Sequence, residues 1–214
     1  MDLINNKRRT QVITLYKYTH PSRAETVIWA LQELGLEYET KEIDGKKGEQ
    51  RSPEFLAVNP FGKIPTITHE GKHFTESLAI IEYLNELHPD KPLTPNKADE
   101  NFAEKNYKLR QVISFGMIEI ESYLWILTKI KVLDNYENWS EGTANNCMKC
   151  IQKALPIAYA WVDEHEYIAG DSFTLADIYY QHLFSWLKML GVELPEQVQD
   201  YLKKLSKREK FPKR

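Results

Sequence analysis

The sequence predicts an α/β domain followed by an all-helical domain, and three observations indicate this. In residues 12–88, short runs rich in β-branched residues alternate with helical apolar patterns. Residues 89–96 read P-D-K-P-L-T-P-N, and their three prolines exclude a helix. From residue 97 to residue 214 the apolar pattern is helical throughout. We therefore expect a domain over 12–88, a linker and a helical domain, with residues 1–11 as a polar extension.

Composition limits the class of protein. The chain has 214 residues, of which 42% are hydrophobic and 28% charged, as expected for one or two compact domains. Its net charge of −3 argues against a nucleic-acid or anionic-membrane partner. No apolar run approaches the roughly 18 residues of a membrane span. With two cysteines and no apolar signal sequence, we expect a protein of the reducing cytoplasm.

The first domain begins with a strand over 12–16 and a helix from Ser22 or Arg23 to Leu34. Apolar residues at helical spacing fall on one face of that helix, and Gly35 is expected to end it. Residues 36–43 predict a second strand, and a polar loop then leads to a short helix that starts at Ser52.

The rest of this domain is built around residues 59–77, which read N-P-F-G-K-I-P-T-I-T-H-E-G-K-H-F-T-E-S. They predict a loop, a strand from Thr66, a turn at Glu70 to Lys72, a second strand and a helix start at Thr75 to Ser77. The resulting order, β-α-β-α-β-β-α, matches a thioredoxin-like fold.

Two features of this stretch indicate chemistry. Pro65 directly precedes a strand, where its missing N–H removes no ladder hydrogen bond. A cis bond there would expose the backbone of Ile64 to an extended ligand, although only about 5–6% of X-Pro bonds are cis. The helix start at Glu76 and Ser77 is suited to a carboxylate, because its N–H groups are unpaired. Plain helix capping explains Ser77 equally well.

The motif N-P-x-G-K-[IV]-P, followed by E-S and an apolar helix, resembles the glutathione transferase superfamily. The resemblance implies a cis Pro65 and glutathione as co-substrate. It also implies that Ile64 pairs with the cysteinyl backbone, that Glu76 and Ser77 hold the γ-glutamyl end, and that Lys63 approaches the glycine carboxylate.

The second domain predicts four helices. They cover about residues 98–130, broken near Gly116, then 140–165, kinked or restarted at Pro156, and finally 175–190 and 195–206.

Before the third of these helices, Thr174 and Asp177 have the spacing of a capping box, which we interpret as structural rather than catalytic. The stretch resembles the N-cap motif of the same superfamily, so the resemblance covers nearly the whole chain.

The expected chemistry is attack by a thiolate, and the first helix start offers hydroxyls that could stabilise it. Ser22 follows Pro21 and lies beside the helix dipole, and its surroundings resemble bacterial and fungal serine-type transferases, although Thr26 replaces an Arg of that pattern. Thr19 is the alternative, by likeness to theta-type members, and Tyr18 is the third.

Two other residues near the first helix start carry ring side chains. Tyr16, within the strand, is expected to pack in a core. His20 is expected to be a solvated loop side chain.

The cysteines exclude a thioredoxin-type oxidoreductase. That chemistry needs a low-pKa cysteine at the first helix start, where this chain has Thr19 to Ser22. Cys147 and Cys150 form a C-x-x-C inside a later helix, where we expect them to be bystanders. No further ligands have zinc-site spacing, so no metal is predicted.

The resemblance implies a glutathione S-transferase active in detoxification, a homodimer with a small hydrophobic electrophile as second substrate. Tyr107, Phe115 and Tyr123 are candidates for contacting that electrophile. Glutathione-dependent peroxide or disulfide reduction, and a non-catalytic binding or regulatory protein, are the alternatives. Isomerase chemistry, as in zeta-like members, would call for a helix start rich in Ser and Cys, which is absent.

Overall fold

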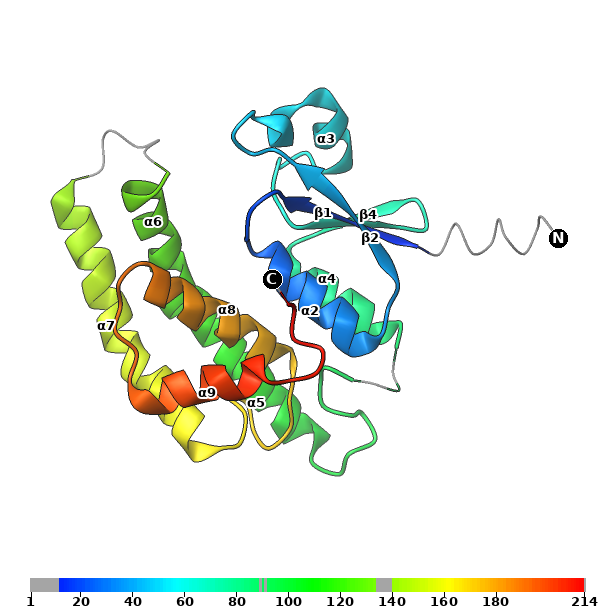
Figure 1. Ribbon diagram of the computed structural model, residues 1–214. Helices are drawn as coiled ribbons and strands as arrows, with labels where there is room; N and C mark the ends of the chain where they lie inside the picture. The colour runs from blue at the N-terminus through cyan, green and yellow to red at the C-terminus, as the bar shows by residue number, and fades with distance from the viewer. Residues whose placement is uncertain (1–11, 89, 91, 134–139, 214) are drawn as a thin grey trace. The chain divides into compact units, whose positions relative to one another are not determined.

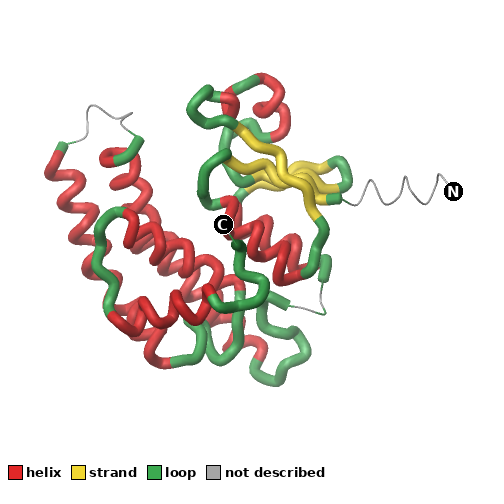
Figure 2. Tube along the Cα trace, viewed as in Figure 1, coloured by secondary structure: helices red, strands yellow, loops and turns green. Residues whose placement is uncertain are grey.

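The computed structural model describes residues 12–88, 90, 92–133 and 140–213. The chain separates into two compact units. The first contains the described residues up to Leu93 and those from Glu209 onward, and the second runs from Thr94 to Arg208. The extension expected over residues 1–11 lies outside the described residues. In the described part of the chain, the strands lie in the first unit and the second unit is helical (Figure 2).

The first unit is built on a four-stranded sheet in the order β2-β1-β3-β4. β2 lies parallel to β1, whereas β3 is antiparallel to both β1 and β4. This arrangement confirms the predicted thioredoxin-like fold. The strands are β1 (Ile13–Tyr18), β2 (Tyr38–Ile43), β3 (Thr66–His69) and β4 (Lys72–Thr75).

Helices cover both faces of this sheet. Figure 1 shows α2 and α4 against one face and α3 on the other. The first strand extends two residues beyond the predicted end at residue 16, because Lys17 and Tyr18 continue to pair with β2. The helical segments of this unit are α2 (Ala24–Leu34), η1 (Glu49–Arg51), α3 (Pro53–Val58) and α4 (Ser77–Glu86).

Alternation along β1 builds two apolar layers. Ile13 and Leu15 are buried, at 1% and 0% exposure. Tyr16 points to the opposite face, since successive strand residues alternate, and joins Ile43 and Phe55 in a separate cluster. Its ring centroid lies 5.6 Å from that of Phe55. The expectation that Tyr16 packs in a core is confirmed.

The end of the chain belongs to the first unit, whereas the sequence assigned it to the helical domain. The ring of Phe211 packs edge-on against Trp29 of α2, with 4.9 Å between centroids. Trp29 is only 1% exposed and donates its indole N–H to Glu33. The last residues therefore complete the cover of α2.

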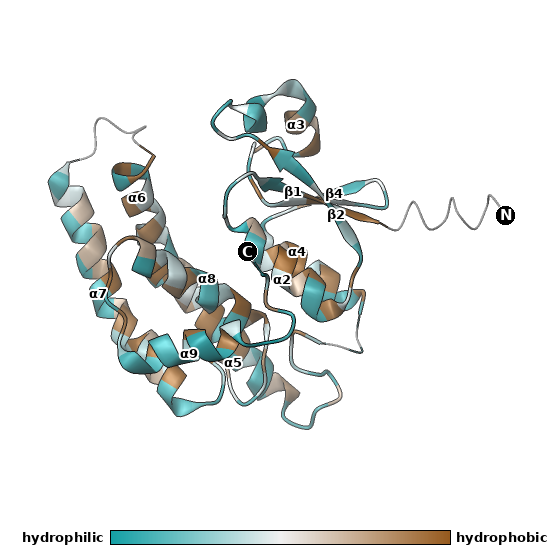
Figure 3. Cartoon of the chain, viewed as in Figure 1, coloured by the Kyte–Doolittle hydropathy of each residue, from teal (hydrophilic) through white to brown (hydrophobic). Residues whose placement is uncertain are grey.

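The second unit consists of packed helices. α5 (Phe102–Phe115), the π-helix η2 (Gly116–Glu121) and α6 (Ser122–Lys131) replace the predicted helix over 98–130. α7 (Glu141–Glu164) runs through Pro156 without a restart. α8 (Leu175–Met189) and α9 (Glu196–Ser206) follow. Figure 3 shows α9 largely hydrophilic on the face in view, whereas Val198, Tyr201 and Leu205 on its other face are buried.

The break expected near Gly116 does not occur: the chain stays helical from Phe102 to Lys131, and a π-helical segment begins at Gly116. A Cβ on Gly116 would lie 2.7 Å from a ring carbon of Tyr179 and 2.9 Å from the hydroxyl oxygen of Tyr180. The Tyr180 hydroxyl donates to the carbonyl of Val112 at 2.7 Å, and that of Tyr179 donates to Glu121 at 2.7 Å. Two tyrosines of α8 thus occupy the space that a side chain at residue 116 would need.

No helix in the described part of the chain combines the length and apolar character that crossing a bilayer would require.

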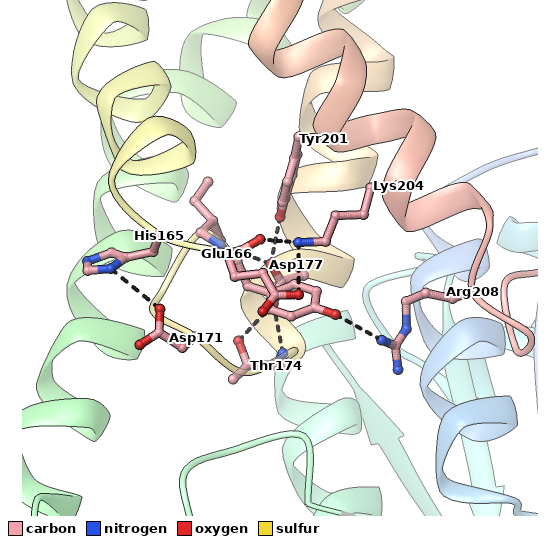
Figure 4. Close-up of polar contacts among 10 residues, drawn as sticks. His165, Glu166, Asp171, Thr174, Asp177, Tyr201, Lys204 and Arg208 are labelled. Carbon is pink, nitrogen blue, oxygen red and sulfur yellow. Dashed lines mark hydrogen bonds and ion pairs between the residues drawn. The ribbon is translucent and has the colours of Figure 1, made fainter.

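Asp177 fixes the start of α8, as the predicted capping box requires. Its carboxylate is fully buried and accepts four hydrogen bonds. The donors are the Ile168 N–H (3.0 Å), the Thr174 N–H (2.7 Å), the Thr174 hydroxyl (3.2 Å) and the Tyr201 hydroxyl (2.7 Å). Burial raises the pKa of Asp177, and these donors oppose the shift. The residue joins the loop before α8, α8 itself and α9 (Figure 4).

Two cations, Lys204 of α9 and Arg208 just after its end, contact aromatic rings of the same loop. The Lys204 ammonium lies 3.9 Å from the ring centroid of Tyr167, and the Arg208 guanidinium lies 3.7 Å from that of Phe173. Lys204 also donates to the carbonyl of Glu166, as Figure 4 shows. Cation–π contacts of this kind contribute about 0.5–2 kcal/mol each.

Replacing Asp177 with Ala should lower the free energy of unfolding by about 3 kcal/mol, because it removes a cap and leaves buried donors without an acceptor. Asp171→Ala is the matched control, since that aspartate lies in the same loop with its side chain 87% exposed. The control should change stability by less than about 0.5 kcal/mol. Urea unfolding followed by circular dichroism measures both, and equal losses for the two variants would contradict the structural role.

Candidate functional site

Three chain segments end at one edge of the sheet. Tyr16 of β1 pairs with Thr66 of β3, and Thr66 pairs with Thr75 of β4. The end of β1, the residues before Thr66 and those after Thr75 therefore leave the sheet on the same side, although Lys17 and Tyr18 still pair with β2. This edge gathers the end of β1, the Ile64–Pro65 bond and the start of α4.

The peptide bond between Ile64 and Pro65 is cis, as the resemblance implies. Ile64 is half-buried and packs against the cluster of Tyr16, Ile43 and Phe55. Within the described part of the chain, its backbone N–H and C=O groups have no protein hydrogen-bond partner. These groups can therefore pair with the backbone of an extended ligand, as one more strand would.

Asn59 holds the loop that carries this bond. Its side chain is 1% exposed and donates to the carbonyl of Lys63 at 2.9 Å and to the hydroxyl of Thr66 at 3.0 Å. Its carbonyl oxygen accepts from the Phe61 N–H at 3.0 Å. A buried amide with three partners fixes the path of residues 59–66. Lys63 itself is exposed.

Gly62 permits the tight turn inside this loop. It has φ of 60°, and an added Cβ would lie 2.6 Å from the carbonyl oxygen of Gln50. Arg51 approaches from the same side and donates to the carbonyl of Phe61 at 3.2 Å. Both the backbone conformation and the contact exclude a larger residue.

The start of α4 has an unusual backbone. Glu76 precedes the helix with φ of 65° and ψ of 111°, a region that non-glycine residues rarely adopt. Such strain is of order 1–3 kcal/mol and concentrates at functional positions. Ser77 is the first helical residue and is half-buried. No protein partner is found for its hydroxyl within the described residues, so the hydroxyl and the first-turn N–H groups can receive an anion.

Ser22 lies two residues before Ala24, the first residue of α2. Its Oγ accepts a hydrogen bond from the Ala24 N–H at 3.2 Å, and its carbonyl accepts from the Glu25 N–H at 3.1 Å. The N-cap position of α2 is Arg23, whose side chain makes no capping hydrogen bond. Because the Ser22 hydroxyl serves as an acceptor for Ala24, its own proton is still available for donation. Accepting from the helix start and donating to an anion are thus compatible in one residue.

The other hydroxyls considered for this role differ in setting. Thr19 lies exposed in the loop. Tyr18 is half-buried at the end of β1, and its ring stacks on His20 with 5.1 Å between centroids and an interplanar angle of 5°. Burial raises the pKa of Tyr18, and the charge of Arg51 lowers it by a smaller amount. The exposed His20 ring lies on the phenol rather than at the helix start.

The aromatic candidates for electrophile contact are not equivalent. Tyr107 on α5 is 64% exposed. Phe115 packs edge-on against Trp161 with 5.1 Å between centroids. Tyr123 is half-buried and interacts with the Cys150 thiol. Of the three, Tyr107 has most of its side chain available to a ligand.

A cavity of about 460 Å³ lies elsewhere, in the second unit between α7 and the loop before α9. None of the predicted glutathione residues lines it. We place the candidate site at the sheet edge, where the chemical groups converge, rather than at this open cavity.

Among the described residues, no group of three or more His, Cys, Asp or Glu side chains is placed to hold a metal ion.

Two contributors to the site were missed by sequence reasoning. The motif around Asn59 gave this residue no role of its own, yet its buried side chain forms the hydrogen bonds that hold the loop. A turn-forming Asn between a helix and a proline was the available signal. The positive φ of Glu76 had no local signal, since glycine or asparagine is the usual residue there.

Comparison with known proteins agrees with this architecture. Residues 11–86 match the family model "Glutathione S-transferase, N-terminal domain", and residues 124–213 match "Glutathione S-transferase, C-terminal domain". The chain is 31% identical over 173 residues to "Glutathione S-transferase 1" of Dianthus caryophyllus, covering 79% of this chain and 75% of the relative.

Two further comparisons bear on fold and function. The chain is 31% identical over 167 residues to the "Probable maleylacetoacetate isomerase" of Caenorhabditis elegans, covering 77% of this chain and 73% of the relative. The chain also resembles a solved structure, that of the glutathione transferase URE2P6 from Phanerochaete chrysosporium in complex with oxidized glutathione. The two chains superpose with a TM-score of 0.81 at 22% sequence identity, covering 95% of this chain and 94% of that one. With both domain models matched in order and a relative above 30% identity over most of its length, the chain belongs to the glutathione S-transferase family.

Proposed function

We propose that this protein is a glutathione transferase of the serine type, in which Ser22 activates the thiol of bound glutathione for attack on a hydrophobic electrophile. One observation supports this role above the others. Ser22 stands at the start of α2, its Oγ accepts from the Ala24 N–H at 3.2 Å, and its proton is free to be donated. Family membership makes glutathione the co-substrate.

The energies are sufficient for this role. A free thiol has a pKa of about 8.5 and is mostly protonated at neutral pH. Lowering that pKa by about 2 units requires roughly 2.7 kcal/mol of preferential thiolate stabilisation. A hydrogen bond from a hydroxyl to an anion contributes about 1.5–3 kcal/mol, and a helix N-terminus about 0.3–2 kcal/mol. The Ser22 hydroxyl and the start of α2 together reach the required value.

Glutathione would lie along the sheet edge in an extended form. The N–H and C=O groups of Ile64, before Pro65, would pair with its cysteinyl backbone. The hydroxyl and N–H of Ser77 would bind the γ-glutamyl carboxylate, and Glu76 would accept from the α-amino group. Lys63 would approach the glycine carboxylate. In this direction each charged group of glutathione lies next to a protein group of opposite charge or a hydrogen-bond donor, whereas the reverse direction would place like charges together.

Replacing Ser22 with Ala should raise the pKa of the bound glutathione thiol toward about 8.5 and lower kcat/KM by about 10–100-fold, because one charge-assisted hydrogen bond is lost. Thiolate absorbance of the complex, titrated against pH, measures the shift. Ser22→Gly separates this effect from capping, since glycine at a helix start costs only a few tenths of a kcal/mol. It should lose thiol activation to the same extent while keeping most of the stability.

Thr19→Ala is the second control and should leave the thiol pKa unchanged. If Thr19→Ala raises the pKa and Ser22→Gly does not, the transferase function stands and Ser22 is the wrong residue. If wild type binds glutathione with an unshifted thiol pKa, the non-catalytic binding protein is the better description.

Replacing Ser77 with Ala should weaken glutathione binding about 10–100-fold, since a hydrogen bond to the carboxylate is lost. Ser140→Ala is the matched control, because Ser140 caps α7 in the other unit by accepting from the Thr143 N–H at 3.2 Å. Calorimetric titration with glutathione measures both affinities. An unchanged affinity for Ser77→Ala, or an equal loss for Ser140→Ala, would contradict the assignment.

Isomerisation is a second candidate function, favoured by the likeness to the isomerase of Caenorhabditis elegans. The same thiolate would add to a conjugated double bond, allow rotation and then leave again. Assaying maleylacetoacetate beside aromatic chloride electrophiles distinguishes the two functions. Glutathione-dependent peroxide reduction would use the same site.

We also propose a cytoplasmic homodimer, which is the usual state in this family.

A further inference from the structure

The only two cysteines of the chain lie one helical turn apart on α7. Both are free thiols. Cys147 is 5% exposed, whereas Cys150 is half-buried. Because residues three apart share one face of a helix, both sulfurs lie on the same side of α7. No part of the proposed glutathione chemistry uses this pair.

The pair faces another helix rather than open solvent. α6 packs against α7. The Tyr123 side chain of α6 lies next to the Cys150 thiol, which helps to raise the pKa of the tyrosine. Burial raises the pKa of Cys147, so its thiol is protonated at neutral pH. Cys147 therefore lacks the low pKa of a catalytic cysteine nucleophile.

Helix geometry disfavours a direct disulfide between these two residues. Side chains three apart on a helix have Cβ atoms about 5–6 Å from each other. A disulfide requires a Cβ separation of about 3.5–4.5 Å, so oxidation would distort the middle of α7. A single thiophilic atom between the sulfurs removes this conflict. With bonds of about 2.3 Å, as in zinc thiolates, it holds the sulfurs roughly 3.5 Å apart instead of about 2 Å.

The number of protein ligands at this pair of thiols indicates which kind of thiophilic atom could bind there. A structural zinc site takes four protein ligands. In the described part of the chain, no third His, Cys, Asp or Glu joins the pair. Two thiols suit an acceptor with two exchangeable positions and an affinity for soft sulfur ligands. A trivalent arsenical with one organic substituent has this valence.

We propose that Cys147 and Cys150 form a dithiol site that binds trivalent monosubstituted arsenicals. The reaction is R-As(OH)2 with two thiols, giving R-As bonded to both sulfurs and two molecules of water. Two As–O bonds break, two As–S bonds form, and the thiol protons leave with the hydroxyl groups. Arsenic stays trivalent, so no oxidant or reductant is needed.

Because Cys150 is more exposed than Cys147, the two As–S bonds are expected to form in a fixed order. Cys150 is the more accessible thiol and forms the first As–S bond. Cys147 then closes the chelate from one turn away, where its effective concentration far exceeds that of a free thiol. The site lies in the helical unit and is independent of the proposed glutathione site.

Phenylarsine oxide tests the proposal with the folded, full-length protein. Wild type should form a single covalent adduct by intact-mass spectrometry. The adduct should survive a large excess of 2-mercaptoethanol and be removed by 2,3-dimercaptopropanol. Cys147→Ser and Cys150→Ser each leave one thiol, and each should bind about 100-fold more weakly, because the chelate is lost.

Thermal unfolding provides a second measurement. The adduct should raise the Tm of wild type and leave the Tm of both variants unchanged, since tight binding stabilises the native state. Cys150→Ser, at the half-exposed position, should fold and bind glutathione as wild type does. An adduct on either variant that resists 2-mercaptoethanol overturns the proposal, and so does the absence of an adduct on folded wild type.

Discussion

The antiparallel pairing of β3 with β1 is the constraint on which the site depends. It places Tyr16, the last residue of β1 that pairs with β3, opposite the first residue of β3, Thr66. β4 then pairs with β3 so that Thr75 ends in the same row. A shift of this register by one residue would turn every side chain of the strand to the other face. The apolar side chains of β1, buried on both faces of the sheet, oppose such a shift.

Buried polar side chains position the irregular segments that the sheet cannot hold. In the first unit, Asn59 fixes the loop before Pro65 through three hydrogen bonds. In the second, Asp177 fixes the start of α8 through four. In each case one nearly inaccessible group satisfies backbone donors or acceptors that would otherwise be unpaired. The loops at the sheet edge and before α8 are therefore as well defined as the helices beside them.

The chain presents two kinds of thiol chemistry in two different settings. At the start of α2, Ser22 and free N–H groups stabilise a thiolate that a substrate brings. Along α7, the protein's own thiols are partly or wholly buried and lie away from any helix start. The first setting favours a charged nucleophile, whereas the second favours neutral thiols that exchange with a soft acceptor. The difference follows from position along a helix and from burial rather than from the residue type.

Local signals in the sequence determined the secondary structure and the fold class. Four local features were predictable, because the residues that make their contacts lie within a few positions of one another. They are the β-branched runs, the helix end at Gly35, the helix start at Ser52 and the capping box at Thr174. The stretch of residues 59–77 was likewise recognisable from its own residues.

Only the tertiary structure decided the remaining features. The positive φ of Glu76 had no local signal in the sequence. The π-helical segment from Gly116 and the packing of Phe211 on Trp29 depend on neighbours distant in sequence. The role of the Ser22 hydroxyl as acceptor from the Ala24 N–H, two residues along the chain, also followed only from the structure, because several local hydrogen-bond patterns are open to a serine near a helix start. Sequence patterns report contacts between residues a turn or a hairpin apart, whereas contacts between distant segments exist only once the chain is folded.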